Sequence, residues 1–413
     1  MDFKHLIPQE KILKALDEQG LKIPTPIQLQ AIPKILEGGD LRASAQTGTG
    51  KTAAFLLPIL QKIALDEQNE SKMKFKGPKV LILVPTRELA IQVSKEAAKF
   101  SKYLSKMKTV CIYGGAPYPM QNRELSRPYE ILVATPGRLI DHMERGRIVF
   151  GRLEVLILDE ADRMLDMGFL GPVEEIAAAT PADRQTLMFS ATFNKHVNRL
   201  SERLLKNPTQ IEIKPQIDAK ENIEQRLHPV DDLNHKYRLL DHFLADETLV
   251  QTIIFTSTKR QADTLVDILL EKGHKADALH GDMNQRQRER TIEKLRKGFL
   301  RVLVATDVAA RGIDIQSITH VINFDLPNSA EDYVHRIGRT GRAGKSGIAL
   351  SLASPKERYL VREIEKYTGL QIASIVIPGL EPKERPKTLP DSKRKTFFKP
   401  KQHRHKKPAF RRR

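Results

Sequence analysis

The chain has 413 residues, which is enough for two or three domains that each bury a hydrophobic core. Its hydrophobic content is 40%, and no apolar run reaches the roughly 18 residues that a membrane-spanning helix needs. A single cysteine, Cys111, excludes an intrachain disulfide and a cysteine-based zinc site, and the first residues lack the regions of a signal peptide. We therefore expect a cytoplasmic protein with no membrane partner.

The net charge of +18 is unevenly distributed. Residues 382–413 hold 14 Lys or Arg and 2 Asp or Glu, a net of +12, which leaves +6 for the remainder of the chain. Since this segment has few residues that could form a core, we predict that it is disordered. It is either a solubilising tail or, as we favour, a tail that binds nucleic acid through its cations, with stacking on Phe397, Phe398 and Phe410 as a secondary contribution.

The first functional pattern along the chain is a phosphate-binding loop. Residues 45–52 read Ala-Gln-Thr-Gly-Thr-Gly-Lys-Thr, which fits the phosphate-loop pattern except that alanine replaces the first glycine. Glycines let backbone N–H groups and the N-terminus of the following helix face the phosphates. We expect Lys51 to reach the outer phosphates and the Thr52 hydroxyl to ligate Mg²⁺. The residues of this loop predicted to bind ATP are Gln46, Thr47, Gly48, Thr49, Gly50, Lys51 and Thr52. The preceding strand is unusually polar, because it contains Arg42 and Ser44.

Short apolar runs that end in polar or glycine-containing loops follow in the first half. They span Val80–Val84, Ile131–Val133, Val155–Leu158 and Leu187–Phe189, and amphipathic helical stretches such as Glu88–Phe100 lie between them. Apolar strands without alternation, separated by helices, are typical of a parallel sheet covered on both faces. Such sheets bind ligands at the carboxyl ends of their strands, where these loops are expected.

The sequence Asp-Glu-Ala-Asp at 159–162 directly follows the apolar run Val155–Leu158. At the end of a strand, Asp159 is expected to hold Mg²⁺, through water, and Glu160 to orient or deprotonate the attacking water. The alternative, an acidic surface turn, does not explain the apolar strand that precedes it.

The pattern begins again in the second half, with apolar runs at Thr252–Phe255, Val302–Val304 and Val321–Phe324. The sequence Leu-Val-Ala-Thr occurs at 132–135 and again at 303–306, which supports duplicated domains that present paired loops to one ligand. A polar stretch with two prolines, from about 207 to 222, is predicted as the linker. We therefore predict an α/β fold with parallel-sheet domains at 1–208 and 222–379, a linker at 209–221 and the basic tail at 380–413.

An arginine-rich cluster at 335–342 is the most informative segment, because four cations in eight positions do not belong in a core. Phosphoryl transfer develops charge on the γ-phosphate, and an arginine that stabilises this charge contributes about 10³–10⁵ in rate. Arg339 and Arg342 lie three apart on a predicted helix, so they share a face and are the candidates. Arg336 points elsewhere, and binding of nucleic acid stays open as its role.

Taken together, these motifs resemble, in order from Phe3 to Arg342, those of the DEAD-box ATP-dependent RNA helicases of superfamily 2. The short basic tail resembles that of bacterial members. The resemblance implies two tandem RecA-like domains that close on ATP, Mg²⁺ and RNA. It implies ATP hydrolysis that drives sequence-independent local unwinding of short RNA duplexes or remodelling of ribonucleoproteins. Single-stranded and short duplex RNA are the expected partners of a monomer, in ribosome assembly, RNA decay or cold adaptation.

The segment from Pro24 to Gln28 resembles the family's Q motif, with Phe3 upstream. The resemblance implies that Thr25 and Gln28 bind ATP, and that the Gln28 amide reads adenine with both its donor and its acceptor. Leu21 stands where the family usually has an aromatic residue. An apolar floor under the base is kept but stacking is lost, so weaker nucleotide affinity is expected.

The family also implies roles for residues in the loops of both domains. Ser190 and Thr192 resemble the motif whose hydroxyls couple hydrolysis to unwinding, and His335 is implied to meet Asp162 across the cleft. Gly312 and Asp314 resemble ATP contacts, Asp314 at the ribose. Gln285 and Arg288 match the family's Gln-x-x-Arg. The implied RNA-backbone contacts are Pro85, Thr86, Arg87, Gly114, Gly115, Thr135, Gly137, Arg138, Thr258, Gly281 and Thr306. Hydroxyls, glycine amides and arginines suit phosphates and do not read base edges.

Two other functional classes share part of this sequence pattern. One is an ATP-gated RNA clamp or annealing chaperone without productive unwinding, which an altered catalytic residue would favour; none of the key positions is altered. The other is a superfamily 2 DNA translocase. The Q motif, the Asp-Glu-Ala-Asp sequence and the lack of inserted domains argue against it.

Overall fold

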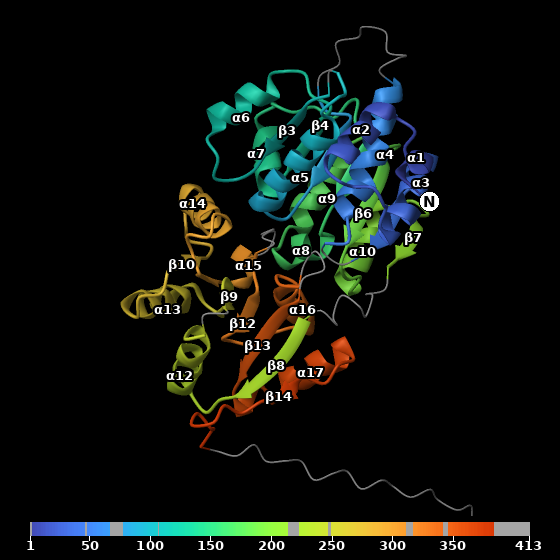
Figure 1. The fold of residues 1–413 in the computed structure, drawn as a ribbon. Coiled ribbons are helices and arrows are strands. Elements are labelled where there is room, and N and C mark those ends of the chain that lie inside the picture. The colour runs from blue at the N-terminus through green and yellow to red at the C-terminus, as the bar shows by residue number, and fades with distance from the viewer. Residues whose placement is uncertain are drawn as a thin grey trace, which may run out of the picture.

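The computed structural model describes residues 2–45, 48–66, 77–105, 107–213, 223–246, 249–310, 317–341 and 346–383. The described residues form two α/β domains, each built on a seven-stranded sheet in which all pairings are parallel (Figure 1). The first sheet contains β1 (Leu41–Ser44), β2 (Val80–Leu83), β3 (Thr109–Ile112), β4 (Ile131–Ala134), β5 (Val155–Leu158), β6 (Gln185–Ser190) and β7 (Thr209–Glu212). The second contains β8 (Ile223–Pro229), β9 (Thr252–Phe255), β10 (Ala276–Leu279), β11 (Val302–Ala305), β12 (His320–Asn323), β13 (Gly347–Ala353) and β14 (Ala373–Ser374). The predicted parallel-sheet fold is confirmed.

The two sheets have the same strand order. It is β3-β4-β2-β5-β6-β1-β7 in the first sheet and β10-β11-β9-β12-β13-β8-β14 in the second, so β8 takes the place of β1, β9 that of β2, and so on to β14 in the place of β7. The repeated Leu-Val-Ala-Thr falls on β4 and β11, which occupy equivalent places. The short repeat in the sequence therefore marks a true structural correspondence.

Helices cover both faces of each sheet, because successive strand residues enter two different cores. In β2, Val80 and Ile82 pack into one core and Leu81 and Leu83 into the other. The helices on the first core are α1 (Phe3–Leu6), α2 (Glu10–Glu18), α3 (Pro26–Glu37), α4 (Lys51–Asp66) and α5 (Arg87–Phe100). The helices on the second are α6 (Tyr118–Leu125), α7 (Pro136–Glu144), α8 (Ala161–Asp166), α9 (Leu170–Ala178) and α10 (Lys195–Leu204). Two buried faces explain why the strands are continuously apolar.

The second domain repeats this three-layer arrangement. One face of its sheet carries α12 (Leu233–Leu244) and α13 (Lys259–Glu271). The other face carries α14 (Gln285–Arg296), α15 (Asp307–Ala310), α16 (Ala330–Ile337) and α17 (Arg358–Thr368), which follows the short 3₁₀ turn η1 (Pro355–Glu357). No helix among the described residues is long and apolar enough to cross a membrane.

The domain boundaries differ from the prediction at two points. Residues 209–212, predicted as the start of the linker, form β7, which pairs with β1 and extends the first sheet to Glu212. Most of the predicted linker, residues 214–222, lies outside the described residues. At the other end, the backbone N–H of Lys383 donates to Asp231 at 2.8 Å, so the second domain continues past residue 379. The tail from 384 onward lies outside the described residues.

Candidate functional site

The phosphate loop leaves the sheet at the end of β1. The backbone N–H of Ala45 donates to the carbonyl of Ser190 at 3.0 Å, and α4 begins at Lys51. Gly48 and Gly50 have φ values of +87° and +90°, the left-handed conformation that side chains disfavour, so the glycines are required by the turn itself. Gln46 and Thr47, predicted to bind ATP, lie outside the described residues.

The polar residues of β1 have partners in the loop that follows β6. The Arg42 guanidinium lies 4.1 Å from the centre of the Phe193 ring, and the Ser44 hydroxyl donates to the Ala191 carbonyl at 3.4 Å. A cation over an aromatic face and a hydrogen-bonded hydroxyl are both tolerated beside a core. These two contacts account for the unusual polarity of β1, because they link this strand to the loop at residues 191–193.

Lys51 and Asp159 lie together as two buried charges at the end of the first sheet. Lys51 is 6% exposed and Asp159 is 3% exposed, and no hydrogen-bond partner for the Lys51 ammonium is found among the described residues. Burial raises the pKa of Asp159 to about 6, although the nearby Lys51 acts to lower it, and Glu160 and Asp162 raise it further. A buried ammonium without a partner is costly, so this arrangement is suited to an anionic ligand that supplies one.

The raised pKa of Asp159 predicts a pH-dependent stability. Because its folded pKa of about 6 lies above the ordinary 3.8, ionising this carboxyl opposes folding. Its favourable contribution is present below about pH 4 and is lost as the pH rises through about 6. In metal-free, nucleotide-free buffer, Asp159→Asn should raise the free energy of unfolding at pH 8 by up to about 3 kcal/mol, with little effect at pH 4. Urea unfolding at pH 4 and pH 8 measures the difference in the free energy of unfolding between the two proteins. An equal increase at both pH values would contradict the prediction.

Glu160 adopts a strained backbone conformation directly after Asp159. Its φ of 53° and ψ of 52° place it in the left-handed region, where a residue with a side chain costs about 1–2 kcal/mol. Its N–H donates to the Asp159 carboxylate at 3.0 Å, and α8 begins at the next residue, Ala161. The strained turn projects the two carboxylates from successive positions at the end of β5.

Asp162 connects α8 to the loop after β6. Its carboxylate accepts from the backbone N–H groups of Ala191 and Thr192 at 3.2 and 3.1 Å and from the Thr192 hydroxyl at 3.2 Å. The Ser190 hydroxyl in turn donates to the Thr192 carbonyl at 2.7 Å. The structure thus brings together three of the four predicted coupling residues. The fourth, His335, forms no hydrogen bond with Asp162 in the described part of the chain, and burial together with Arg163 holds its pKa well below the usual value.

Arg163, which sequence reasoning missed, links the two domains. Its Nη1 lies 2.7 Å from the Asp332 carboxylate on α16 and 3.3 Å from Asp166, and its side chain is 5% exposed. Asp332 is held in place by the Ser329 hydroxyl at 2.9 Å. The only signal in the sequence was an arginine directly after the Asp-Glu-Ala-Asp segment. An ion pair across the domain boundary, with Arg163 buried and Asp332 22% exposed, favours the closed arrangement.

Breaking this pair should weaken closure. Truncating one member of a buried, hydrogen-bonded pair costs about 2 kcal/mol or more, so Asp332→Ala should weaken binding of single-stranded RNA in the presence of a non-hydrolysable ATP analogue about thirtyfold. The reversed pair Arg163→Asp with Asp332→Arg should recover most of that loss. Asp166→Asn removes the exposed partner of Arg163 and serves as the control, with a small effect. Failure of the reversed pair to recover any affinity would contradict a direct interaction.

The arginine cluster differs from its prediction. α16 ends at Ile337, with Gly338 as its C-cap, so Arg339 lies beyond the helix and the predicted shared helical face with Arg342 is wrong. Arg339 is 6% exposed, and its Nε donates to the His335 carbonyl at 3.2 Å. Arg342 lies outside the described residues, as do Gly312 and Asp314.

Arg336 has a structural role, so the option of nucleic-acid binding left open for it is wrong. It is 2% exposed and binds Asp307 through two bonds of 2.6 and 2.7 Å. Its third nitrogen donates to Asn323 and to the Asp325 carbonyl. These bonds fasten α16 to α15 and to the end of β12, which fixes the position from which Arg339 follows.

The residues of the predicted adenine site contact the phosphate loop. The Gln28 Oε1 accepts from the Thr25 N–H at 2.9 Å, and its Nε2 donates to the Gly50 carbonyl at 3.1 Å. A side chain at residue 50 would meet the Gln28 Nε2 at 2.4 Å, which is a second reason for glycine there. Leu21 is 38% exposed, and Phe3 is buried in the first core.

A groove of about 500 Å³ brings together most of the predicted RNA contacts, seven from the first domain and one, Gly281, from the second. Eight of the eleven line it, namely Pro85, Thr86, Arg87, Gly114, Thr135, Gly137, Arg138 and Gly281. Gly115 lies under Arg87, whose Nη1 would be 2.5 Å from a side chain at that position. Arg138 is committed in part, because it donates to the Ala116 carbonyl at 2.8 Å. Thr258 and Thr306 are not among the residues that line the groove.

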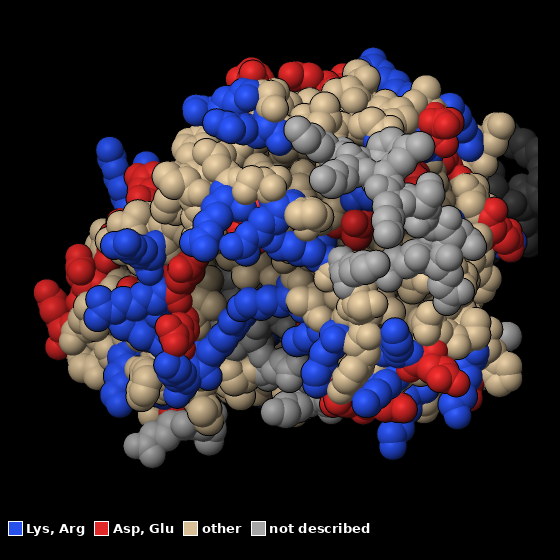
Figure 2. Space-filling model, turned by 90° about the horizontal axis from the view of Figure 1, so that it is seen from above, with Lys and Arg blue, Asp and Glu red and all other residues tan. Residues whose placement is uncertain are grey.

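Two threonines of the groove have counterparts at the equivalent strand ends of the second domain. Thr86 after β2 and Thr258 after β9 are both N-caps whose hydroxyls accept from the backbone three residues on. Thr135 after β4 and Thr306 after β11 each donate their N–H to the neighbouring strand, at 3.1 and 3.2 Å. The two similar sheets therefore carry paired loops, and contact of both loops of a pair with one ligand stays a prediction. Figure 2 shows Lys and Arg side chains gathered on both sides of a hollow on the face seen from above.

Two contacts join the domains beside this groove. Arg288 on α14 binds Glu88 on α5 at 2.8 Å, with both side chains about one-tenth exposed, and Arg87 donates to Gln285 at 3.4 Å. Burial and Arg288 lower the pKa of Arg87. Both members of the Gln-x-x-Arg sequence therefore contact the first domain. Glu88 is a partner that the sequence analysis did not identify.

Comparison with known proteins decides the family. Residues 25–200 match the DEAD/DEAH box helicase family, and residues 235–344 match the helicase conserved C-terminal domain. The DEAD-box ATP-dependent RNA helicase RhpA of Helicobacter pylori is 42% identical over 391 residues, which is 95% of this chain and 77% of that protein. The chain belongs to the DEAD-box ATP-dependent RNA helicases. It is an enzyme of the ATP-hydrolysing kind, as its sequence indicated.

Solved structures of DEAD-box proteins share its two-domain fold. Dbp5 of S. cerevisiae bound to RNA and ADP BeF3 has a TM-score of 0.77 and 30% identity, over 89% of this chain and 93% of that one. Mss116p bound to ssRNA and AMP-PNP has a TM-score of 0.80 and 30% identity, over 89% of this chain and 77% of that one. The predicted pair of RecA-like domains is thereby confirmed.

Proposed function

We propose that this DEAD-box protein hydrolyses ATP in the cleft between its two domains and uses domain closure to unwind short RNA duplexes locally, without reading their sequence. The observation that carries this proposal is the groove of about 500 Å³, which combines hydroxyls, glycines and arginines of the first domain with Gly281 and Arg288 of the second, where Arg288 pairs with Glu88. A ligand that contacts both halves favours the state in which they are together.

The proposed nucleotide site is centred on Lys51. Its buried ammonium contacts the outer phosphates of ATP. The backbone N–H groups of the phosphate loop, which includes Gly48, Thr49 and Gly50, bind the remaining phosphate. The Thr52 hydroxyl and the Asp159 carboxylate are oxygen ligands of the kind that Mg²⁺ prefers. No cluster of three or more His, Cys, Asp or Glu suited to a metal occurs among the described residues. Bound there, Mg²⁺ would neutralise charge on the phosphates.

In the proposed reaction, Glu160 orients or deprotonates the attacking water, and Arg339, with Arg342, stabilises charge on the γ-phosphate from the second domain. Gln28 recognises adenine, with Leu21 as an apolar floor and Thr25 beside it. Gly312 and Asp314 contact the nucleotide from the second domain. Because the groups come from both domains, hydrolysis depends on closure.

Coupling to RNA is proposed to run through Asp162. Its bonds to Thr192 and the loop at 191–192 connect the carboxylates after β5 to β6, and the neighbouring Arg163 continues to α16. His335 and Arg339 follow on and after that helix. On the RNA side, backbone contacts to phosphates and 2′-hydroxyls give preference for RNA geometry without base readout.

The finer assignments follow from this activity. We propose that the protein acts as a cytoplasmic monomer on ribosomal RNA precursors or RNA-decay substrates, and that the basic tail adds affinity for RNA. A chain with a single cysteine in 413 residues is compatible with a reducing compartment.

The test is steady-state ATP hydrolysis by the full chain with single-stranded RNA, duplex RNA and the matching DNAs, followed by strand separation of a short RNA duplex. We expect stimulation by RNA alone and ATP-dependent separation. Equal stimulation by DNA would favour the translocase instead. RNA-stimulated hydrolysis without strand separation would favour the RNA clamp or annealing chaperone.

A further inference from the structure

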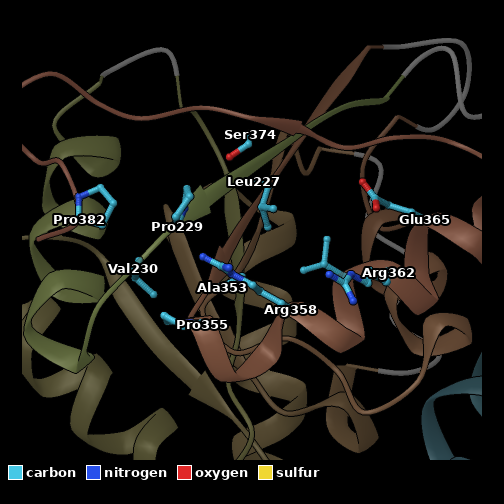
Figure 3. A pocket seen from close by; sticks show the side chains of 11 residues that line it. Leu227, Pro229, Val230, Ala353, Pro355, Arg358, Arg362, Glu365, Ser374 and Pro382 are labelled. Atoms are coloured by element: carbon cyan, nitrogen blue, oxygen red, sulfur yellow. The ribbon is translucent and has the colours of Figure 1, made fainter. Parts of the chain in front are cut away.

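The second domain contains a cavity of about 230 Å³ that neither the ATP site nor the RNA groove uses (Figure 3). It opens at the end of β8 and is bounded by β13, β14 and α17. Its walls are mainly apolar, with Leu227, Val230, Ala353 and Val361, and two arginines, Arg358 and Arg362, stand at its edge. A cavity of about 150 Å³ holds a benzene ring, so this one accommodates a bulky apolar side chain.

The place of the cavity in the fold is that of the phosphate loop in the first domain. The bond from the Val230 N–H to the Ala353 carbonyl, 3.0 Å, is the counterpart of the bond from Ala45 to Ser190, because β8 and β13 correspond to β1 and β6. Ends of parallel strands are where such folds bind ligands. After β8, however, the chain continues with Asp231 and Asp232 and has no glycine. Without glycine the backbone cannot wrap its N–H groups around a phosphate as it does in the first domain, so a nucleotide is not the ligand.

The charge on the other side of the cavity is positive and uncommitted. Arg358, Val361, Arg362 and Glu365 share one face of α17, at the spacing of successive turns. Glu365 is engaged, because it accepts from the Ile372 N–H at 3.0 Å. The side chains of Arg358 and Arg362 form no hydrogen bond or ion pair within the described part of the chain. Figure 3 shows the Arg358 side chain running across the cavity toward Val230.

We propose that this cavity docks a short peptide segment of a partner protein, in which a bulky apolar side chain fills the cavity and neighbouring carboxylates bind Arg358 and Arg362. Arginine and carboxylate form paired charge-assisted hydrogen bonds, and an apolar anchor beside such a pair is typical of the residues that dominate peptide binding. The site thereby selects acidic, apolar segments.

Two other occupants fit the charges less well. The chain's own tail, residues 384–413, contains 13 Lys or Arg and 2 Asp or Glu, so it carries the wrong sign for two free arginines. RNA would find phosphate partners in the arginines but none on the apolar walls. The lining residues belong to the second domain alone, so docking leaves both domains free to open and close. The RNA groove does not distinguish one RNA sequence from another. A partner protein bound at this cavity would instead bring the enzyme to a particular RNA.

A phage library of random twelve-residue peptides, selected on the full chain, tests the proposal. The expected peptides combine a bulky apolar residue with adjacent Asp or Glu. Synthetic copies should bind Arg358→Glu with Arg362→Glu about tenfold or more weakly. Lys356→Glu with Lys366→Glu is the matched control, since it makes the same charge change at exposed positions of η1 and α17 outside the cavity, and should bind as the parent does. Ser374→Trp, which obstructs the cavity without changing charge, should also abolish binding.

All these variants should keep RNA-stimulated ATP hydrolysis, which separates failure of this proposal from failure of the proposed helicase activity. Selected peptides without acidic residues, or equal binding by the cavity and control variants, would overturn the proposal. So would peptide binding that appears only after residues 384–413 are removed, since the tail would then be the occupant. Loss of RNA affinity in the cavity variant, with peptide affinity unchanged, would reassign the site to RNA.

Discussion

Replacement of Lys51 by methionine is expected to reduce RNA-stimulated ATP hydrolysis by at least about 10²–10³-fold. Removing one preorganised hydrogen-bond donor from a site where charge develops lowers kcat by this factor. Lys51 carries a full positive charge and is only 6% exposed. The same change should raise the pKa of Asp159 above about 6, because Lys51 is the neighbour that lowers it. Steady-state kinetics and a carboxyl titration by NMR measure the two effects independently.

Lys62→Met is the matched control for this prediction. It removes a lysine from the same helix, where the ammonium donates to Gln185 at 3.0 Å, and should leave hydrolysis within about twofold of the parent. If Lys51→Met hydrolysed ATP at the parent's rate, the phosphate-contact role of Lys51 would be excluded. A changed pKa of Asp159 with normal turnover would leave the electrostatic description intact and reject the mechanism.

The second large effect is expected for Glu160→Gln. A general base contributes about 10²–10⁴ in rate, so turnover should fall by that factor while ATP and RNA still bind. Binding should survive because the amide has the same shape and the left-handed turn at 160 is kept. Rapid mixing with labelled ATP measures the chemical step, and RNA affinity in the presence of ATP measures closure.

Glu160→Gly separates the carboxylate from the backbone. Glycine has no penalty in the left-handed region, so this variant should be inactive yet more stable to unfolding by about 1 kcal/mol, whereas Glu160→Gln should match the parent in stability. Glu175→Gln, an exposed position on α9, is the surface control and should retain activity. Normal turnover by Glu160→Gln would remove Glu160 from the chemistry, whatever its effect on stability.

The sequence was sufficient for features that depend on local pattern. The apolar runs at 80–84 and 155–158 became β2 and β5 nearly to the residue, because strands buried on both faces are continuously apolar. The phosphate loop could be identified because its turn requires positive φ values at Gly48 and Gly50, and glycine at such positions can be recognised from the sequence alone. The residues that line the groove could also be predicted from local pattern, because its hydroxyls and glycines directly follow strands.

Features set by distant partners could not be predicted. Arg336 lies in a cationic cluster, but it is buried because Asp307, 29 positions earlier, is folded against it. Arg163 and Asp332 are 169 positions apart, and no local pattern pairs them. The helical spacing assumed for Arg339 failed because Gly338 ends the helix. Likewise, residues 209–212 look like linker in composition and became a strand only because the edge of β1 was free to pair.

The identical strand order of the two sheets has an evolutionary consequence. A tandem of one ancestral unit gives natural selection two copies of every strand end, and one copy of each suffices for a given task. The end of β1 carries a loop rich in glycine, whereas the equivalent loop after β8 carries aspartates and no glycine. The threonines after β2 and β9, in contrast, were retained in both copies. Loops at equivalent strand ends thus differ at the phosphate loop and agree at these threonines, while the first domain also has α1, α2 and α3 before its first strand.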